Sequence, residues 1–136
     1  MPPSRETHGV IERAYKAFAD RDVAALRDLA DPEIEIHAVT GALVHGGDPY
    51  RGLAGVEQYM RDVGDVWDEL ELVPSEFHDL DEERTLVFGR VRARRGSTLV
   101  DSPNAWLWRV RDERVVSAQV FGDPEAAVAL LGDGDA

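Results

Sequence analysis

The sequence predicts an α+β fold in which a curled, mostly antiparallel sheet wraps over helices. Helical periodicity dominates the first half of the chain, where one strand interrupts it, and the second half contains four consecutive strands. Helices that are segregated from consecutive strands are typical of α+β domains. The length of 136 residues suits one domain with its own core. We therefore expect a single domain over residues 1–136, with a core from about residue 7 to residue 131.

Two helices open the chain. The first is predicted over residues 7–19, because apolar side chains recur there at helical spacing: Val10, Ile11, Ala14, Tyr15 and Phe18. Asp22 can cap the second helix, which runs to residue 29. Asp31 and Pro32 end it, since a residue before proline avoids the helical conformation.

A strand, a long loop and a third helix follow. Residues 33–39 alternate, with Ile34 and Ile36 on one face and His37 on the other. The loop at residues 40–52 is rich in glycine and long for a compact domain, so we expect it to gate a pocket. The helix over residues 53–69 carries one apolar stripe: Val56, Tyr59, Met60, Val63, Val66, Trp67 and Leu70.

The second half forms the predicted sheet, with strands over residues 70–80, 84–95, 98–110 and 115–121 and a short terminal helix over residues 126–131. In the longest of these strands Asn104, Trp106, Trp108 and Val110 share one face. If both indoles pointed outward, Arg109 would be buried without a partner, so the alternation favours inward tryptophans. We expect them to line a cavity opposite Met60 and Trp67, because a curled sheet over helices leaves a hollow there.

Composition excludes several classes of function. The net charge of −12, from 27 acidic residues against 15 lysines and arginines, argues against binding to nucleic acid or to anionic membranes. The chain has no cysteine, so it has neither disulfides nor thiolate metal ligands. No apolar run approaches the roughly 20 residues of a membrane helix, and the start shows no signal-peptide pattern. We expect a cytoplasmic protein with neither a nucleic-acid nor a membrane partner.

Several local strings, in this order and spacing, resemble the SnoaL-like branch of the nuclear-transport-factor-2-like superfamily. They are VIERAYKAF at residues 10–18, DRD at 20–22, YRG at 50–52, WLWRVRD at 106–112 and FGD at 121–123. The resemblance implies a cone-shaped, cystatin-like fold, an apolar pocket with a few polar groups, and homodimerisation through the outer sheet face. Members of the superfamily include polyketide cyclases, ketosteroid isomerases, epoxide hydrolases and many proteins without enzymatic activity, so the fold does not imply one activity.

The catalytic residues of these relatives transfer poorly to this chain. In the resemblance, the tyrosine and the base of ketosteroid isomerases fall at Ala14 and Ala38, and their oxyanion-hole acid falls at Trp106 or Ala105. Epoxide hydrolases of this fold need an acid on the last strand, where the polar residue is Gln119. Steroid isomerisation and epoxide hydrolysis of these kinds are therefore not expected.

Two residues remain as acid/base candidates. Cyclases of the SnoaL type use one acid in the pocket, which suggests Asp101, although its alternation opposes Trp106 unless a bulge at Ser102 and Pro103 resets it. His37 is the other candidate, because imidazole side chains titrate near neutral pH, but its alternation opposes Ile36 and favours a histidine on the outer face.

The expected pocket residues are aromatic or uncharged polar side chains: Tyr15, Tyr59, Trp67, Asn104, Trp106, Trp108, Gln119 and Phe121. The resemblance implies that Phe121 lines the pocket, and Gln119 is expected there because it lies on the same strand face as Phe121. The four histidines show no metal-ligand spacing, and we expect neither a metal nor a cofactor. The expected ligand is a small hydrophobic molecule. Acid/base chemistry on a ring or carbonyl compound and binding without catalysis both remain open.

Overall fold

The computed structural model describes residues 5–38, 48–121, 125 and 127–128. Its elements are α1 (Arg5–Ala19), α2 (Val23–Leu29), β1 (Ala30–His37), β2 (Tyr50–Arg51), α4 (Gly52–Val66), β3 (Glu69–Asp79), β4 (Arg84–Arg95), β5 (Thr98–Arg111) and β6 (Arg114–Phe121). Residues 125, 127 and 128 are helical. The α+β class is confirmed, with the helices ahead of four consecutive strands. Most of the predicted loop at 40–52 and of the terminal helix at 126–131 lies outside the described residues.

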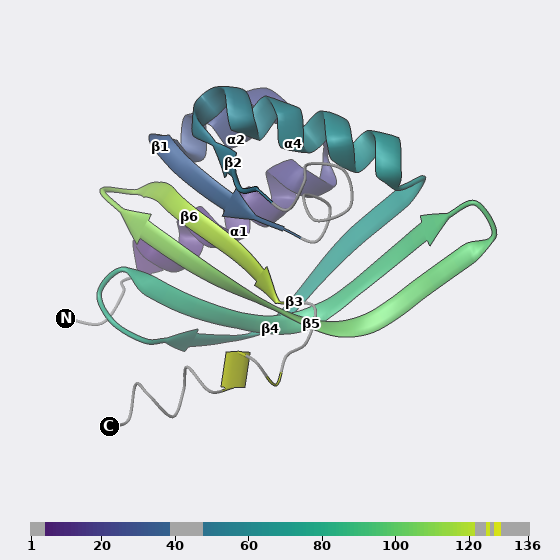
Figure 1. Ribbon diagram of the computed structural model, residues 1–136. Coiled ribbons are helices and arrows are strands. Elements are labelled where there is room, and N and C mark those ends of the chain that lie inside the picture. The colour runs from purple at the N-terminus through teal and green to yellow at the C-terminus, as the bar shows by residue number, and fades with distance from the viewer. Residues whose placement is uncertain (1–4, 39–47, 122–124, 126, 129–136) are drawn as a thin grey trace.

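The strands form one curved sheet in the order β2-β1-β6-β5-β4-β3. All neighbours are antiparallel except β1 and β6, which are parallel. Figure 1 shows α1, α2 and α4 on the concave side of this sheet, and the short helical turn near the C-terminus on the opposite side. The predicted sheet wrapped over helices is therefore confirmed. Of the helices in the described part of the chain, none is long and apolar enough to cross a membrane.

Local signals in the sequence explain two of the element boundaries. The Asp22 side chain accepts a hydrogen bond of 3.1 Å from the backbone N–H of Ala25, which caps α2. Asp112 and Glu113 both have positive φ, at 53° and 62°, as a tight hairpin between β5 and β6 requires. One boundary differs from the prediction: β1 begins at Ala30, ahead of Pro32, because Ala30 pairs with Val115 before a shift in register.

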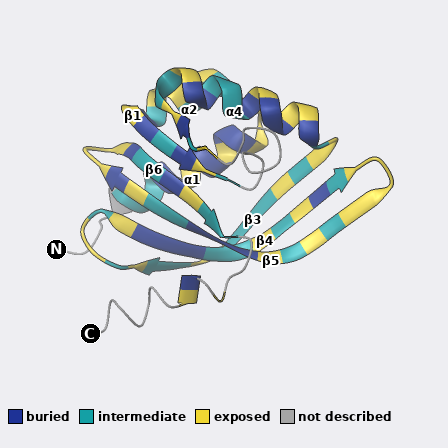
Figure 2. Cartoon of the chain, viewed as in Figure 1, coloured by how far each residue is buried: buried dark blue, intermediate teal, exposed yellow. Residues whose placement is uncertain are grey.

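The main core lies between the concave face of the sheet and the helices. Its fully buried members include Val10 and Ile11 of α1 and Val87 of β4. Figure 2 shows buried positions concentrated where the helices cover the sheet, whereas the far ends of β4 and β5 are mostly exposed. Trp67 was predicted within the long helix, but the helix ends at Val66 and Trp67 is its extended C-cap residue.

A smaller apolar cluster lies on the outer face of the sheet. Leu86 and Ala105 are 0% exposed there and form a buried cluster with Ala127, from the helical residues near the C-terminus. Phe88, Leu107 and Phe121 pack against this cluster and are partly buried. We call these three residues the outer apolar patch.

Candidate functional site

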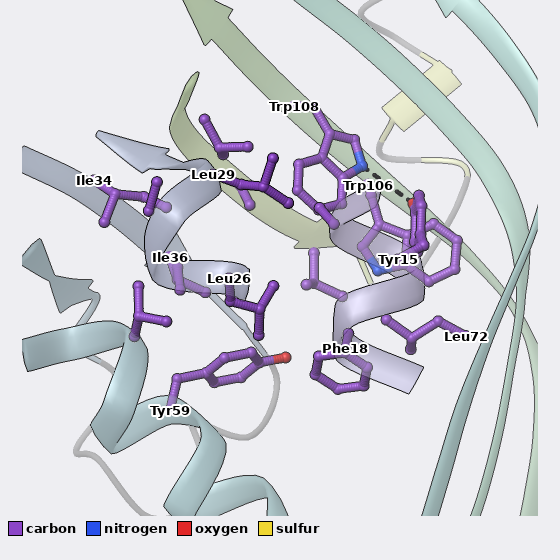
Figure 3. Close-up of a pocket in the computed structure, with 16 residues that line it drawn as sticks. Tyr15, Phe18, Leu26, Leu29, Ile34, Ile36, Tyr59, Leu72, Trp106 and Trp108 are labelled. Carbon is purple, nitrogen blue, oxygen red and sulfur yellow. Dashed lines mark hydrogen bonds between the residues drawn. The ribbon is translucent and has the colours of Figure 1, made fainter. Parts of the chain in front are cut away.

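A cavity of about 80 Å³ lies between the helices and the concave face of the sheet; we call it the inner chamber. Figure 3 shows the 16 side chains that line it. They come from α1, α2, β1, α4, β3, β5 and β6, so the chamber exists only after the sheet has closed over the helices. Its lining is almost wholly apolar, with Leu26 and Leu29 from α2 facing Ile34 and Ile36 from β1.

Three aromatic residues form one wall of the inner chamber. The Tyr15 ring meets Trp106 edge-on, with centroids 5.4 Å apart, and meets Trp108 at 5.2 Å. The Trp108 indole Nε1 donates a hydrogen bond of 3.1 Å to the Tyr15 hydroxyl oxygen, drawn dashed in Figure 3. Burial raises the pKa of the Tyr15 hydroxyl well above its ordinary value, and the Trp108 hydrogen bond opposes that rise only weakly. Tyr15 therefore stays protonated and is held in one orientation.

Tyr59 of α4 lies across the chamber from this wall. Its ring packs 5.2 Å from Tyr50 and 6.0 Å from Phe18, measured between centroids. Burial raises the pKa of Tyr59 to about 12, although the charge of Arg21 pulls in the other direction. The hydroxyl is thus neutral at ordinary pH, and it can donate a hydrogen bond but cannot act as a base.

A second cavity of about 180 Å³, the outer chamber, adjoins the first. Tyr59, Leu72, Trp106 and Val120 line both chambers. The outer chamber extends under the far part of β3, β4 and β5 and reaches Trp67 beyond the end of α4. Ser102 and Asn104 of β5 are polar residues in its lining.

The Asn104 side chain is engaged by the sheet rather than open to a ligand. Asn104 is only 4% exposed. In the amide orientation that suits its neighbours, its Nδ2 donates to the Phe121 carbonyl at 2.9 Å and its Oδ1 accepts from the Ala105 N–H at 3.2 Å. Asn104 therefore extends the hydrogen bonding between β5 and β6 at the end of their pairing.

Both expected acid/base residues lie away from the chambers. His37 is exposed at the end of β1, where it pairs with Gln119. Asp101 is exposed on the outer face, where it accepts a hydrogen bond of 2.9 Å from Arg90. The bulge that could have turned Asp101 inward is absent, because the register of β4 and β5 runs without a break through Ser102.

The expectation that Gln119 and Phe121 line the pocket also differs from the structure. Ala118 pairs with Trp108 and Val120 pairs with Trp106, so Ala118 and Val120 face the chambers. Gln119 and Phe121 alternate with them onto the outer face, where Gln119 is exposed and Phe121 packs against Ala105. A shift in register of β5 against β6 next to Val110 produces this phase, and the sequence shows no glycine or proline to mark it.

The remaining expected pocket residues all line a chamber. Tyr15, Tyr59, Trp106 and Trp108 line the inner chamber, and Tyr59, Trp67, Asn104 and Trp106 line the outer one. Sequence reasoning did not single out Leu26, Leu29 or Leu72, which are ordinary apolar residues of α2 and β3. No signal in the sequence separates a core leucine from one that lines a cavity.

Neither chamber has an aspartate, glutamate, histidine, lysine or arginine among its described lining residues. Across the residues with described positions, no three histidine, aspartate or glutamate side chains come together in a way that could hold a metal ion. The lining can therefore supply apolar contact, aromatic faces and neutral hydrogen bonds. An ionised side chain that transfers a proton to or from a ligand would have to lie outside the described lining.

Residues 11–118 match the family described as the SnoaL-like domain. No curated protein sequence matches the chain significantly.

Solved structures share the fold at low sequence identity. TerC co-crystallized with polyporic acid is 23% identical, with a TM-score of 0.77 over 93% of this chain and 98% of that chain. An NTF2-like protein of unknown function from Burkholderia pseudomallei is 22% identical, with a TM-score of 0.77 over 92% and 96%. IdmH, a putative polyketide cyclase from Streptomyces antibioticus, is 21% identical, with a TM-score of 0.65 over 93% and 98%. At these identities the likeness establishes the fold.

Proposed function

The chain belongs to the SnoaL-like domain family, and from the chambers that its fold encloses we propose that it binds a small, neutral, largely apolar molecule. The observation that carries the proposal is the composition of the lining. Aromatic rings and branched aliphatic side chains surround the inner chamber, and no described lining residue is ionised at neutral pH. Transfer of apolar ligand surface from water into such a lining is favourable, by about 25 cal/mol for each Å² buried.

The size of the two chambers supports a ligand of few rings. Volumes of about 80 Å³ and 180 Å³ together approach the lower end of the range of roughly 300–1,000 Å³ for small-molecule pockets. Trp106 and Tyr59 line both chambers. A ligand in either chamber can therefore contact these two residues. The presence of polyporic acid in the TerC crystal is a further support, since it places a small organic molecule with a protein of this fold.

Acid/base catalysis on a ring or carbonyl compound is the second candidate. The names of several structural neighbours, including the putative polyketide cyclase IdmH, favour it. Such chemistry requires a group that gives and takes a proton near neutral pH. The ionisable groups in the described lining are Tyr15 and Tyr59, whose raised pKa values keep them protonated. Binding therefore accounts for the described lining better than proton transfer does.

Filling the inner chamber tests the proposal. Ala118→Leu places a larger side chain on β6 where Ala118 faces the cavity. The matched control is Gln119→Leu, the next residue on the same strand, which points to the outer face and is exposed. The probe is indane, an uncharged two-ring hydrocarbon, and its binding is followed by tryptophan fluorescence and by calorimetric titration.

We expect indane to bind the wild type and Gln119→Leu with the same affinity and to bind Ala118→Leu at least tenfold more weakly. Equal binding to all three proteins would place the indane site elsewhere and would contradict the proposal. So would an absence of saturable binding to the wild type. Circular dichroism of Ala118→Leu checks that the variant is folded.

A further inference from the structure

The two chambers differ in size, and the difference limits what each can hold. The inner chamber measures about 80 Å³ and the outer chamber about 180 Å³. A dry, apolar protein cavity of about 150 Å³ holds one benzene molecule. On that scale the outer chamber has room for one six-membered ring. The inner chamber has room for about half as many atoms, which corresponds to about three carbons.

The walls of the inner chamber are fixed by contacts behind them. Trp108 donates a hydrogen bond of 3.1 Å to Tyr15, and the Tyr15 ring also packs edge-on against Trp106. On the opposite side Tyr59 packs 5.2 Å from Tyr50, whose side chain is only 1% exposed. Because protein interiors are close-packed, forcing these side chains apart to admit a ring is unfavourable. The small size of the inner chamber is therefore a constraint on the ligand.

The inner chamber is also the deeper of the two. Ile34, Ile36 and Ala118 in its lining are buried, whereas Trp67 and Leu70 in the outer lining are half-buried. The residues that line both chambers form their common boundary: Tyr59, Leu72, Trp106 and Val120. Figure 3 shows one of them, Tyr59, extending from α4 among the lining side chains. A ligand that lies in the outer chamber can therefore reach the inner one with a narrow substituent.

We propose that the outer chamber takes a single six-membered ring and the inner chamber takes a tail of about three carbons, so that the ligand is a neutral one-ring molecule with a short alkyl substituent. This inference rests on the proposed binding function and names the class of ligand. The ring lies against the aromatic faces of Trp67 and Trp106, and the tail lies against Ile36 and Ala118. A rigid frame of three fused rings is excluded, because it would have to displace the fixed walls.

A series of alkylbenzenes tests the two sizes. The probes are benzene and its ethyl, n-propyl and n-pentyl derivatives, each titrated calorimetrically against the wild-type chain. We expect the affinity to rise about fourfold for each carbon up to n-propylbenzene, which corresponds to ~0.8 kcal/mol for each buried methylene. Beyond n-propylbenzene the affinity should stay level or fall, because the inner chamber is then full.

A variant of the inner chamber locates the tail. In Ala118→Leu a larger side chain occupies that chamber, so n-propylbenzene should bind no more tightly than benzene. Benzene itself should keep its wild-type affinity within twofold, since Ala118 is not among the described lining of the outer chamber. Gln119→Leu, on the exposed outer face, should keep the full gain from benzene to n-propylbenzene. An equal loss of affinity for benzene and n-propylbenzene in Ala118→Leu would place the ring in the inner chamber and overturn the assignment.

The outcomes distinguish this inference from the proposed function, and the wild-type series decides it even if Ala118→Leu does not fold. Fluorene, a hydrocarbon of three fused rings, should show no saturable binding. If neither indane nor any alkylbenzene binds, the proposed function fails and the inference fails with it. If these probes bind but fluorene binds as tightly as n-propylbenzene, or the affinity keeps rising to n-pentylbenzene, the binding function stands and the division of the ligand between the chambers is refuted.

Discussion

The substitution Gly89→Ala tests the close approach of β3 to β4, two strands that line the outer chamber. Gly89 pairs with Pro74 where the register of β3 against β4 shifts. A Cβ atom at Gly89 would lie 2.1 Å from the Val73 carbonyl oxygen and 2.9 Å from the Pro74 Cα. Both neighbours are backbone atoms, so a side chain cannot simply rotate away. The two strands would have to move apart by about 1 Å to restore an ordinary contact.

The expected cost follows from this clash. Extra atoms in a well-packed place typically cost about 1–3 kcal/mol, and more where the backbone must move. We expect Gly89→Ala to lower the free energy of unfolding by about 3 kcal/mol, a large share of the roughly 5–15 kcal/mol that stabilises a domain. Probe affinity should fall as well, because Val91 and Ala93 follow on the same strand and line the outer chamber.

Urea unfolding measures the effect, and Gly64→Ala is the matched control. A Cβ at Gly64 meets nothing within 4 Å, and the position is exposed on α4. There alanine should raise the free energy of unfolding by about 0.5 kcal/mol, since glycine costs more backbone entropy in a helix. The reasoning would be refuted if both variants unfolded within 0.5 kcal/mol of each other, which is below the ~3 kcal/mol scale of the clash.

Two further predictions concern pH and assembly. Burial raises the pKa of Tyr59 to about 12 and raises those of Tyr15 and Tyr50 as well, whereas an unfolded tyrosine titrates near 10. The native state therefore holds protons that the unfolded chain releases, so urea midpoints should change little between about pH 7 and pH 10 and should fall toward pH 12; an unchanged midpoint from pH 10 to pH 12 would contradict this. We also expect a homodimer through the outer apolar patch, with sedimentation at micromolar concentration giving twice the 15.1 kDa chain mass and Leu107→Glu giving the single chain. A wild-type species at the mass of one chain would count against the dimer.

The alternation of side chains was predictable from the sequence alone. Residues two apart on a strand share a face whatever the strand packs against, so the common face of Trp106 and Trp108 follows from local geometry. Helical spacing likewise placed Tyr15 on the buried face of α1. The α+β class followed from the order of these patterns along the chain.

The composition of the site depended on tertiary structure. Which residues of β6 face the chambers is decided by its register against β5, and one shift in that register moved Gln119 and Phe121 outward and Ala118 inward. The unbroken register of β4 and β5 similarly kept Asp101 outside. Local periodicity therefore determined which faces are apolar, whereas non-local hydrogen bonding between strands determined which atoms meet in the cavity.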